Sequence, residues 1–509
     1  MAGLLVSLVA LPLCLGIAVA SGFPPVAGVV TAIVGGLVAT PFGSAPVTIK
    51  GPAAGLIVIV LGSVHDLGGG DAMLGYRATL AVGVVAALIQ IVLAAARAGT
   101  LADMFPSSVL QGMLAAIGIL LLSRQVHVLL GVAPTSRTPL ALLAEIPHSI
   151  AQANVPVVVV ALASAAALLL WPRLGWRFVP APVVVVVVAI PLGAFFGFDR
   201  IRDFEFAGLS WSVGPQLLVQ LPDDLGAAIV TPDFSRILSS TSLKYVVMLA
   251  FVGTVESLLS ARAVDKLDPW RRQPDLSRDL FSVGVGNLVS AGLGGLPMIS
   301  EIVRSSTNAA AGGRTGWANA FHGAFLLGFV TLLPSVIHHV PLAALATLLV
   351  HTALRLASPG VFREARKIGP EHLTVVLTTL MATLAVDLLV GIAAGLIVNA
   401  VLCLRSGSSL RALLRPRFDV ETNDDAAVVR VREAAVFTGF PALRRAIHAT
   451  GASSVTVDLS RARLVDHTTL ERLHELAAQL DTRGTRLTIA GLDDHTPTSS
   501  HPWAARQRR

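Results

Sequence analysis

Charged residues are scarce in this sequence. Only 14% of its 509 residues are Asp, Glu, Lys or Arg, whereas soluble domains usually carry about 25%. The deficit lies in the first four fifths of the chain, where apolar runs alternate with short polar breaks, which excludes an ordinary soluble protein. The net charge of +7 does not indicate a nucleic-acid partner, because the basic residues lie mainly between the apolar runs.

Cysteine is equally scarce. Cys14 and Cys403 both lie in apolar segments without metal-ligand spacing, so neither a disulfide framework nor a zinc site is predicted. The sequence has no nucleophile–base arrangement, no phosphate-binding loop and no dinucleotide fingerprint. We therefore predict no enzymatic activity, no cofactor and no bound metal apart from a coupling ion.

The apolar runs predict a polytopic α-helical membrane protein. A run of about 20 apolar residues spans the hydrocarbon core as a helix, and many such runs in series indicate about fourteen spans. The predicted spans are 4–20, 25–39, 52–64, 78–96, 108–122, 155–171 and 180–198 in the first half, and 243–261, 280–293, 300–311, 318–338, 342–356, 372–386 and 388–404 in the second.

The loop charges predict an orientation in the membrane. With a cytoplasmic N-terminus, the basic residues fall mainly in cytoplasmic loops, which is the positive-inside pattern. We therefore predict a multi-pass protein of the inner (plasma) membrane with both termini cytoplasmic. The basic residues assigned to these loops are Lys50, Arg97, Arg173, Arg177, Arg262, Lys266, Arg271, Arg272, Arg278, Arg314, Arg363, Arg366 and Lys367.

Two predicted spans, 52–64 and 300–311, are too short to cross about 30 Å of hydrocarbon at about 1.5 Å per residue. Each follows a segment with strand character, 47–50 and 296–299. Paired short segments at matching positions in two halves are typical of inverted repeats with a binding site near the middle of the membrane. The alternative is a pair of re-entrant helices without function.

The starts of these short helices are suited to an anion. Free N–H groups and a dipole end of about +0.5 favour anions at a helix N-terminus. The sequence Gly-Pro-Ala-Ala-Gly at 51–55 combines a proline suited to a first helical turn with small residues that let backbone amides approach a ligand. Ile299, Ser300 and Glu301 open the other helix. Close helix packing is the alternative reason for the small residues.

Three of the ionisable residues inside predicted spans are candidates for function, because such residues are costly there and indicate function by default. Arg304 is a candidate to neutralise the anion, with a structural ion pair as the alternative. Glu256 is a candidate to carry a coupling proton or to bind Na⁺. Glu301 is a second coupling candidate, although an acidic residue in a first helical turn also complements the helix dipole.

The chain beyond residue 423 is charged and predicts a small α/β domain. Expected strands are 428–431, 435–437, 454–459 and 486–490, and expected helices are 441–450 and 469–480. The predicted organisation is a transmembrane domain at 1–404, a linker at 405–417, a cytoplasmic domain at 418–495 and a disordered tail at 496–509.

Several stretches resemble the sulfate permease (SulP) family of anion transporters: 10–22 (ALPLCLGIAVASG), 51–55, 256–267 (ESLLSARAVDKL) and 294–315 (GGLPMISEIVRSSTNAAAGGRT). The C-terminal domain resembles the STAS (sulfate transporter and anti-sigma antagonist) domain through 457–460 (VDLS) and 464–469 (LVDHTT). The resemblance covers nearly the whole chain and is closest to a bacterial branch often linked with carbonic anhydrases, which makes bicarbonate a rival to sulfate.

This resemblance implies two inverted seven-span repeats arranged as core and gate domains, a homodimer, and a cytoplasmic protein partner for the STAS domain. It also implies that Glu256 is the coupling residue of the eighth span. The anion would lie between the third and tenth spans, bordered by Pro52, Ala53, Ala54, Ile299, Ser300 and Arg304.

The sequence departs from the family pattern at three places. Leu13 stands after Pro12 where many relatives have Gln, and Glu301 stands where a small or hydroxyl residue is expected. Thr468 lies where anti-sigma proteins carry a phosphorylatable serine, which makes it a regulatory candidate.

The expected function is secondary active transport of sulfate or bicarbonate coupled to H⁺ or Na⁺. A nucleobase-type symporter of the same architecture and a membrane sensor that signals through the STAS domain are the alternatives.

Overall fold

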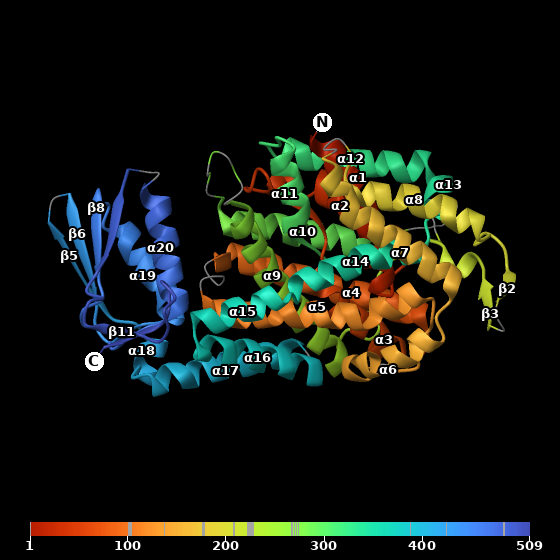
Figure 1. Cartoon of the computed structure of the whole chain (residues 1–509). Coiled ribbons are helices and arrows are strands. Elements are labelled where there is room, and N and C mark those ends of the chain that lie inside the picture. The colour runs from red at the N-terminus through yellow and green to blue at the C-terminus, as the bar shows by residue number, and fades with distance from the viewer. Residues whose placement is uncertain are drawn as a thin grey trace. The chain divides into compact units, whose positions relative to one another are not determined.

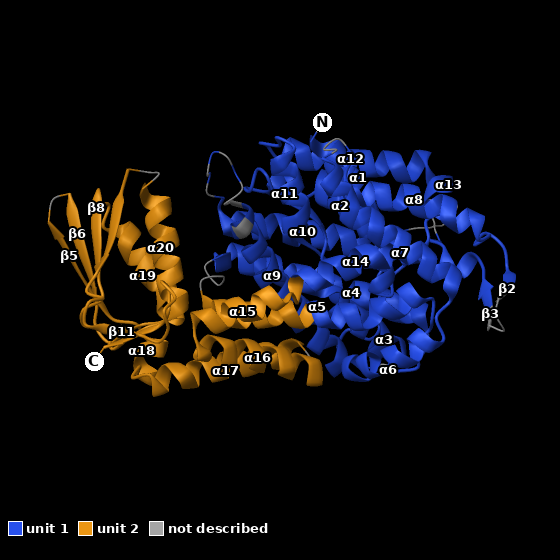
Figure 2. Ribbon diagram, in the orientation of Figure 1, with its two compact units in different colours: residues 1–99, 118–355 blue, residues 100–117, 356–509 orange. Residues whose placement is uncertain are grey.

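The computed structural model contains many helices, a paired strand ladder and a C-terminal α/β region (Figure 1). It describes all residues except 1, 100–103, 137, 176–178, 207–208, 221–228, 266–267, 269, 271, 273, 387, 424, 482–483 and 509. The chain forms two compact units (Figure 2). Unit 1 comprises residues 1–99 and 118–355, and unit 2 comprises residues 100–117 and 356–509.

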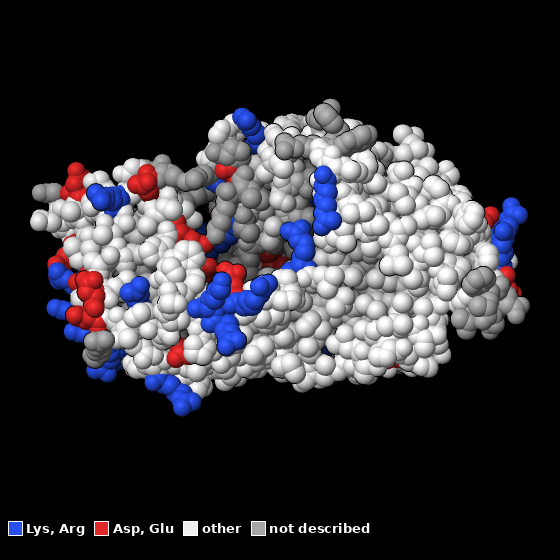
Figure 3. Space-filling view, viewed as in Figure 1, with Lys and Arg blue, Asp and Glu red and all other residues white. Residues whose placement is uncertain are grey.

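Unit 1 consists mainly of apolar helices. In lipid, a helix satisfies its backbone groups internally, so an apolar helix needs no polar partner there. In the view of Figure 3 the surface of this unit carries few charged side chains. The helices are α1 Ala2–Ala20, α2 Pro25–Leu37, α3 Ile57–Gly68, α4 Ala72–Ala95, α6 Pro139–Ala151, α7 Val155–Leu170, α8 Ala181–Phe195, α9 Ser240–Asp265, α10 Leu276–Gly292, α11 Ile302–Ala310, α12 Trp317–Leu332, α13 Pro334–His338 and α14 Leu342–Leu356, with α5 Ser107–Leu130 shared between the units.

Eight helices within the described residues are long and apolar enough to cross a membrane. Three shorter apolar helices span Ala54–Gly68, Ala181–Phe195 and Trp317–Leu332. The protein is therefore a polytopic helical membrane protein, while the number of about fourteen spans stays a prediction. The span expected at 318–338 is divided, because Pro334 begins a separate helix after α12.

A two-stranded antiparallel ladder lies among these helices. Strand β1 Ile49–Pro52 pairs with β4 Met298–Glu301, with Lys50 opposite Ser300 and Gly51 opposite Ile299. Both expected strands are present, but each lies two residues further along the chain than predicted, so Ile299, Ser300 and Glu301 belong to β4 and the helix begins only at Ile302. A second hairpin, β2 Arg202–Phe206 with β3 Leu209–Val213, also belongs to unit 1.

Buried side chains satisfy the outer edges of the ladder. A two-stranded ladder leaves a row of free N–H and C=O groups on each edge, and apolar surroundings offer them no water. The Ile49 amide donates to Ser305 Oγ at 2.8 Å, and the Lys50 amide donates to Asn319 Oδ1 at 3.3 Å. On the other strand, the Met298 amide donates to Asn287 Oδ1 at 2.6 Å. Three neighbouring helices thus hold the ladder in place.

Unit 2 joins helices to a C-terminal α/β domain. Its sheet has the order β10-β8-β6-β5, with β5–β6 antiparallel and the other pairs parallel. Helices α19 and α20 pack their apolar side chains against this sheet, which forms a separate core. The elements are α15 Pro359–Ile368, α16 Pro370–Ala385, α17 Leu388–Arg405, α18 Leu410–Leu414, β5 Phe418–Asn423, β6 Ala426–Val431, β7 Ala434–Ala435, α19 Phe440–Ala449, β8 Ser454–Asp458, β9 Leu464–Val465, α20 His467–Asp481 and β10 Arg486–Ala490.

The prediction of a disordered tail at 496–509 is wrong. Strand β11 His495–Pro497 pairs with β12 Arg506–Arg508, and β12 pairs with β9. Ala504 is fully buried, and His495 Nε2 lies 2.7 Å from the carbonyl oxygen of Ala462. The polar composition misleads here, because backbone pairing to β9 rather than an apolar pattern orders the segment.

Candidate functional site

Both short helices begin directly after the ladder. A 3-10 turn, η2 Ala54–Leu56, leads from β1 into α3, which has 12 residues, and α11 follows β4 immediately and has 9 residues. Because the strands are antiparallel, the helices continue from opposite ends of the ladder, and Figure 1 shows α11 and α3 toward opposite sides of unit 1. The free backbone N–H groups at the starts of η2 and α11 therefore lie close to the same ladder.

Arg304 is buried beside the ladder without full hydrogen bonding. Its side chain is 1% exposed on α11, and its Nε and Nη1 atoms have no hydrogen-bond partner among the described residues. The guanidinium packs against Gly51, where a Cβ atom would collide with Nη1. A glycine is therefore required at position 51 for this approach.

Glu256 meets the other glycine of the same motif. It projects from α9, is 9% exposed, and its Oε2 atom lacks a hydrogen-bond partner within the described part of the chain. The carboxylate lies against Gly55, and a Cβ atom at that position would collide with Oε1. The two glycines of residues 51–55 thus make room for one basic and one acidic side chain.

Glu301 stands at the start of α11, where it is only partly buried. Its carboxyl group lies near the Ala54 backbone amide and near the guanidinium of Arg304. A carboxyl group of the protein itself therefore lies near the first turn of η2, where a helix start favours an acidic side chain.

The remaining predicted anion-binding residues lie on the ladder and the turn after it. Pro52 and Ala53 are buried at the end of β1, and Ala54 begins η2. Ile299 and Ser300 are buried on β4, where the Ser300 hydroxyl donates to Asp279 Oδ2 at 3.0 Å. The structure thus brings the six predicted anion-binding residues to one ladder and the helical segments that follow its strands, while Glu256 reaches the same place from α9.

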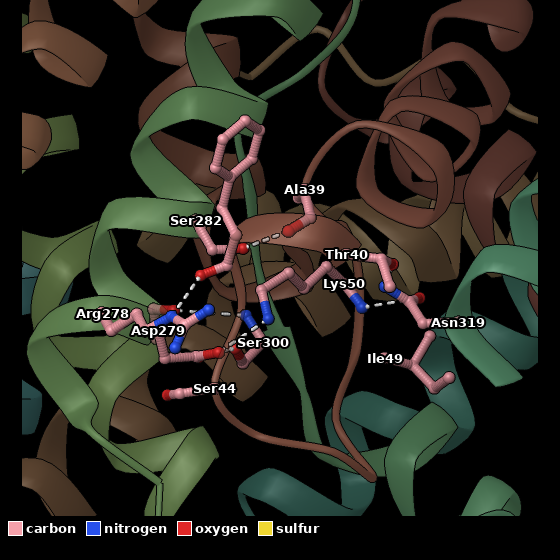
Figure 4. Close-up of polar contacts among 12 residues, drawn as sticks. Ala39, Thr40, Ser44, Ile49, Lys50, Arg278, Asp279, Ser282, Ser300 and Asn319 are labelled. Atoms are coloured by element: carbon pink, nitrogen blue, oxygen red, sulfur yellow. Dashed lines mark hydrogen bonds and ion pairs between the residues drawn. The ribbon is translucent and has the colours of Figure 1, made fainter. Parts of the chain in front are cut away.

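The assignment of Lys50 to a cytoplasmic loop is wrong. Lys50 is 2% exposed on β1, and its Nζ donates to Oδ1 of the buried Asp279 at 2.7 Å (Figure 4). Sequence reasoning missed Asp279 because it falls just before the predicted span 280–293. The signal that could have found the pair is a lysine directly preceding the Gly-Pro motif within a strand of apolar neighbours.

The regulatory candidate Thr468 is 5% exposed in the first turn of α20. Its Oγ1 accepts a hydrogen bond from the Ser107 amide at 3.2 Å. Asp466 precedes it and accepts from the amides of Thr469 and Phe437 at 2.7 Å each. Burial nevertheless raises the pKa of Asp466 above its usual range, because desolvation penalises the charged form.

Comparisons with known proteins agree with this architecture. The bicarbonate transporter BicA of Picosynechococcus sp. is 24% identical over 412 residues, which cover 81% of this chain and 70% of that protein. The putative sulfate transporter YbaR of Bacillus subtilis is 23% identical over 495 residues, covering 97% of this chain and 94% of that protein.

Solved structures share the fold. The transmembrane domain of a cyanobacterium bicarbonate transporter BicA matches with a TM-score of 0.64 at 24% identity, over 78% of this chain and 96% of that chain. The murine Solute Carrier 26 family member A9 anion transporter matches with a TM-score of 0.67 at 16% identity, over 96% of this chain and 84% of that chain. Residues 1–379 match the sequence model of the sulfate permease family. Since this match covers well over half of the sequence, the chain belongs to the sulfate permease family.

Proposed function

We propose that this protein is a secondary active transporter of a small inorganic anion, bicarbonate or sulfate, which binds between the first turns of η2 and α11. The observation that carries the proposal is the buried guanidinium of Arg304, with two nitrogen atoms unpaired among the described residues. An unsatisfied buried cation is costly, and an anion would give it charge-assisted hydrogen bonds. The names of BicA and YbaR support the same substrate class.

Charge balance favours the monovalent anion. Arg304 contributes one positive charge, and the two helix starts contribute about +0.5 each. Glu256 and Glu301 balance these charges when both are ionised, while Lys50 is neutralised by Asp279. A monovalent anion then needs one H⁺ or Na⁺ to keep the site neutral, and a divalent anion needs two. We therefore favour bicarbonate, with one coupling cation for each anion.

The two carboxylates are the proposed coupling residues. Glu301 lies at the Ala54 amide, where it competes with the substrate for the same positive helix end. Protonation of Glu301 would release this amide for the anion. Glu256 has an unpaired oxygen against Gly55, which suits it to bind a proton or to ligate Na⁺.

The α/β domain is proposed to be a STAS-like regulatory domain with a cytoplasmic protein partner. The contact of Thr468 with the start of α5 supports a mechanical link between this domain and a membrane helix. It also keeps the sensor alternative open, whereas no observation favours a nucleobase substrate. A homodimer in the plasma membrane with both termini cytoplasmic completes the proposal.

Uptake of labelled bicarbonate and sulfate into proteoliposomes, with an imposed H⁺ or Na⁺ gradient, tests the function. We expect saturable uptake that follows one of the two gradients and falls at least tenfold in Glu256→Gln. Unchanged gradient-driven uptake in that variant would remove Glu256 from the mechanism. Uptake of labelled uracil instead of either anion would overturn the substrate class.

A further inference from the structure

One carboxylate contacts both members of a cross-strand pair in the ladder. Asp279 of α10 accepts from Lys50 Nζ through Oδ1 at 2.7 Å and from Ser300 Oγ through Oδ2 at 3.0 Å (Figure 4). Lys50 lies on β1 and Ser300 on β4, and the two residues face one another in the ladder register. Asp279 therefore connects the two strands through their side chains at a single position.

This contact is sealed from water. Asp279 is 1% exposed, Lys50 is 2% exposed and Ser300 is fully buried. Gly43 lies over the ion pair, since a Cβ atom there would stand 3.2 Å from Lys50 Nζ and 3.6 Å from Asp279 Oδ1. Gly35 of α2 packs against the Lys50 backbone on another side. A buried pair of this kind cannot exchange partners with water, so either charge alone would be strongly unfavourable.

The register of so short a ladder needs side-chain contacts that favour one pairing of the strands over the others. A ladder of four residues per strand has few backbone hydrogen bonds to select one pairing over another, and a slip by one residue sends every side chain to the opposite face. A slip would move Gly51 away from Arg304 and would change the distance between the two helix starts. Only the observed register presents Lys50 and Ser300 to the same carboxylate.

We propose that Asp279 is a positioning residue that fixes the β1–β4 register, and thereby sets the spacing of the two helix starts and of Arg304 around the anion. This inference rests on the proposed function. Asp279 does not touch the proposed anion position; it acts through Lys50 and Ser300. A role in stability alone makes a different prediction, namely a less stable protein with an unchanged KM.

The test removes both charged side chains of the contact together, so that no unpaired charge is left buried. In the double variant Lys50→Met with Asp279→Ala, we expect the KM for bicarbonate to rise at least tenfold, with a smaller change in maximal rate. Hydrogen exchange of the amides at 49–51 and 298–301, measured by mass spectrometry on the full-length protein, should accelerate at least tenfold. Ser282→Ala is the matched control, because Ser282 lies one turn further on α10 and bonds Ala39 O at 2.6 Å.

The control variant is expected to keep the native KM and the native exchange of the ladder. A folded double variant with native KM, or with native ladder exchange, would overturn the proposal. If the double variant does not fold, Lys50→Met with Asp279→Asn retains an acceptor for Ser300, and it should show an intermediate acceleration; native exchange there would also overturn the proposal. If the native protein transports no anion, the proposed function fails, while the exchange measurement still decides the role of Asp279.

Discussion

The guanidinium of Arg304 lies directly against Gly51, in the space that a side chain at position 51 would occupy. The two residues belong to α11 and β1, so the missing side chain lets the two halves of the site meet. The same relationship recurs at Gly55, where the carboxylate of Glu256 fills the corresponding space. Gly51 and Gly55 therefore each allow an ionisable side chain to approach the backbone closely.

Gly51→Ala should displace the guanidinium of Arg304, because the new methyl group collides with Nη1. We expect the KM for the transported anion to rise at least tenfold in proteoliposome uptake. Gly328→Ala is the control, since a Cβ atom at this position of α12 meets nothing within 4 Å. Equal KM values for the native protein and Gly51→Ala would contradict the assignment.

Glu301→Gln should uncouple transport from the proton gradient. Glutamine keeps the shape of the side chain but removes the charge that competes with the anion at the Ala54 amide. We expect uptake of the anion to persist and to lose its dependence on an imposed pH gradient. The measurement is initial uptake rate with and without that gradient, and a retained gradient dependence would exclude Glu301 as the proton carrier.

Thr468→Val should loosen the start of α5. The Thr468 hydroxyl accepts from the Ser107 amide, one of the free N–H groups of a helix start, and loss of such a capping contact typically costs about 0.5–2 kcal/mol. Hydrogen exchange of the amides at 107–110 should accelerate accordingly. Unchanged exchange there would show that the contact does not stabilise α5.

Asp466→Asn should alter how stability depends on pH. Burial raises the pKa of Asp466 in the folded domain. The folded state therefore binds a proton more tightly than the unfolded state does, and this stabilises the fold fully at a pH below the ordinary aspartate pKa of about 4. The stabilisation is lost as the pH rises through the pKa of the folded state. The stability of the native protein relative to Asp466→Asn should therefore decrease from acid to neutral pH. Hydrogen exchange of α20 at several pH values measures this difference, and a difference that grows with pH would contradict it.

Local sequence patterns were enough to predict several elements of the fold. The short helices after strand-like segments are present, and the strands at β6, β8 and β10 lie close to the expected positions. Arg304 and Glu256 stand out in the sequence because a charge inside an apolar run has few explanations. These features depend on neighbours along the chain, so periodicity and composition detect them.

The remaining features depend on contacts between distant residues. Lys50 and Asp279 are 229 residues apart, and the apolar neighbours of Lys50 in the sequence do not identify its partner. The sequence predicts that Gly51 and Gly55 let a ligand approach the backbone. In the structure, the groups that approach them are the side chains of Arg304 and Glu256. Strand β12 likewise depends on pairing with β9, which the polar composition of the segment conceals.

The central claim is that an anion binds at the unpaired guanidinium of Arg304. Uptake of labelled bicarbonate and labelled sulfate by the native protein and by Arg304→Met, each in proteoliposomes, tests it most directly, because methionine keeps an apolar stem of similar length without the charge. We predict saturable uptake of at least one anion by the native protein and a loss of at least tenfold in the variant. Uptake of neither anion by the native protein, or equal uptake by a folded Arg304→Met variant, would contradict the claim.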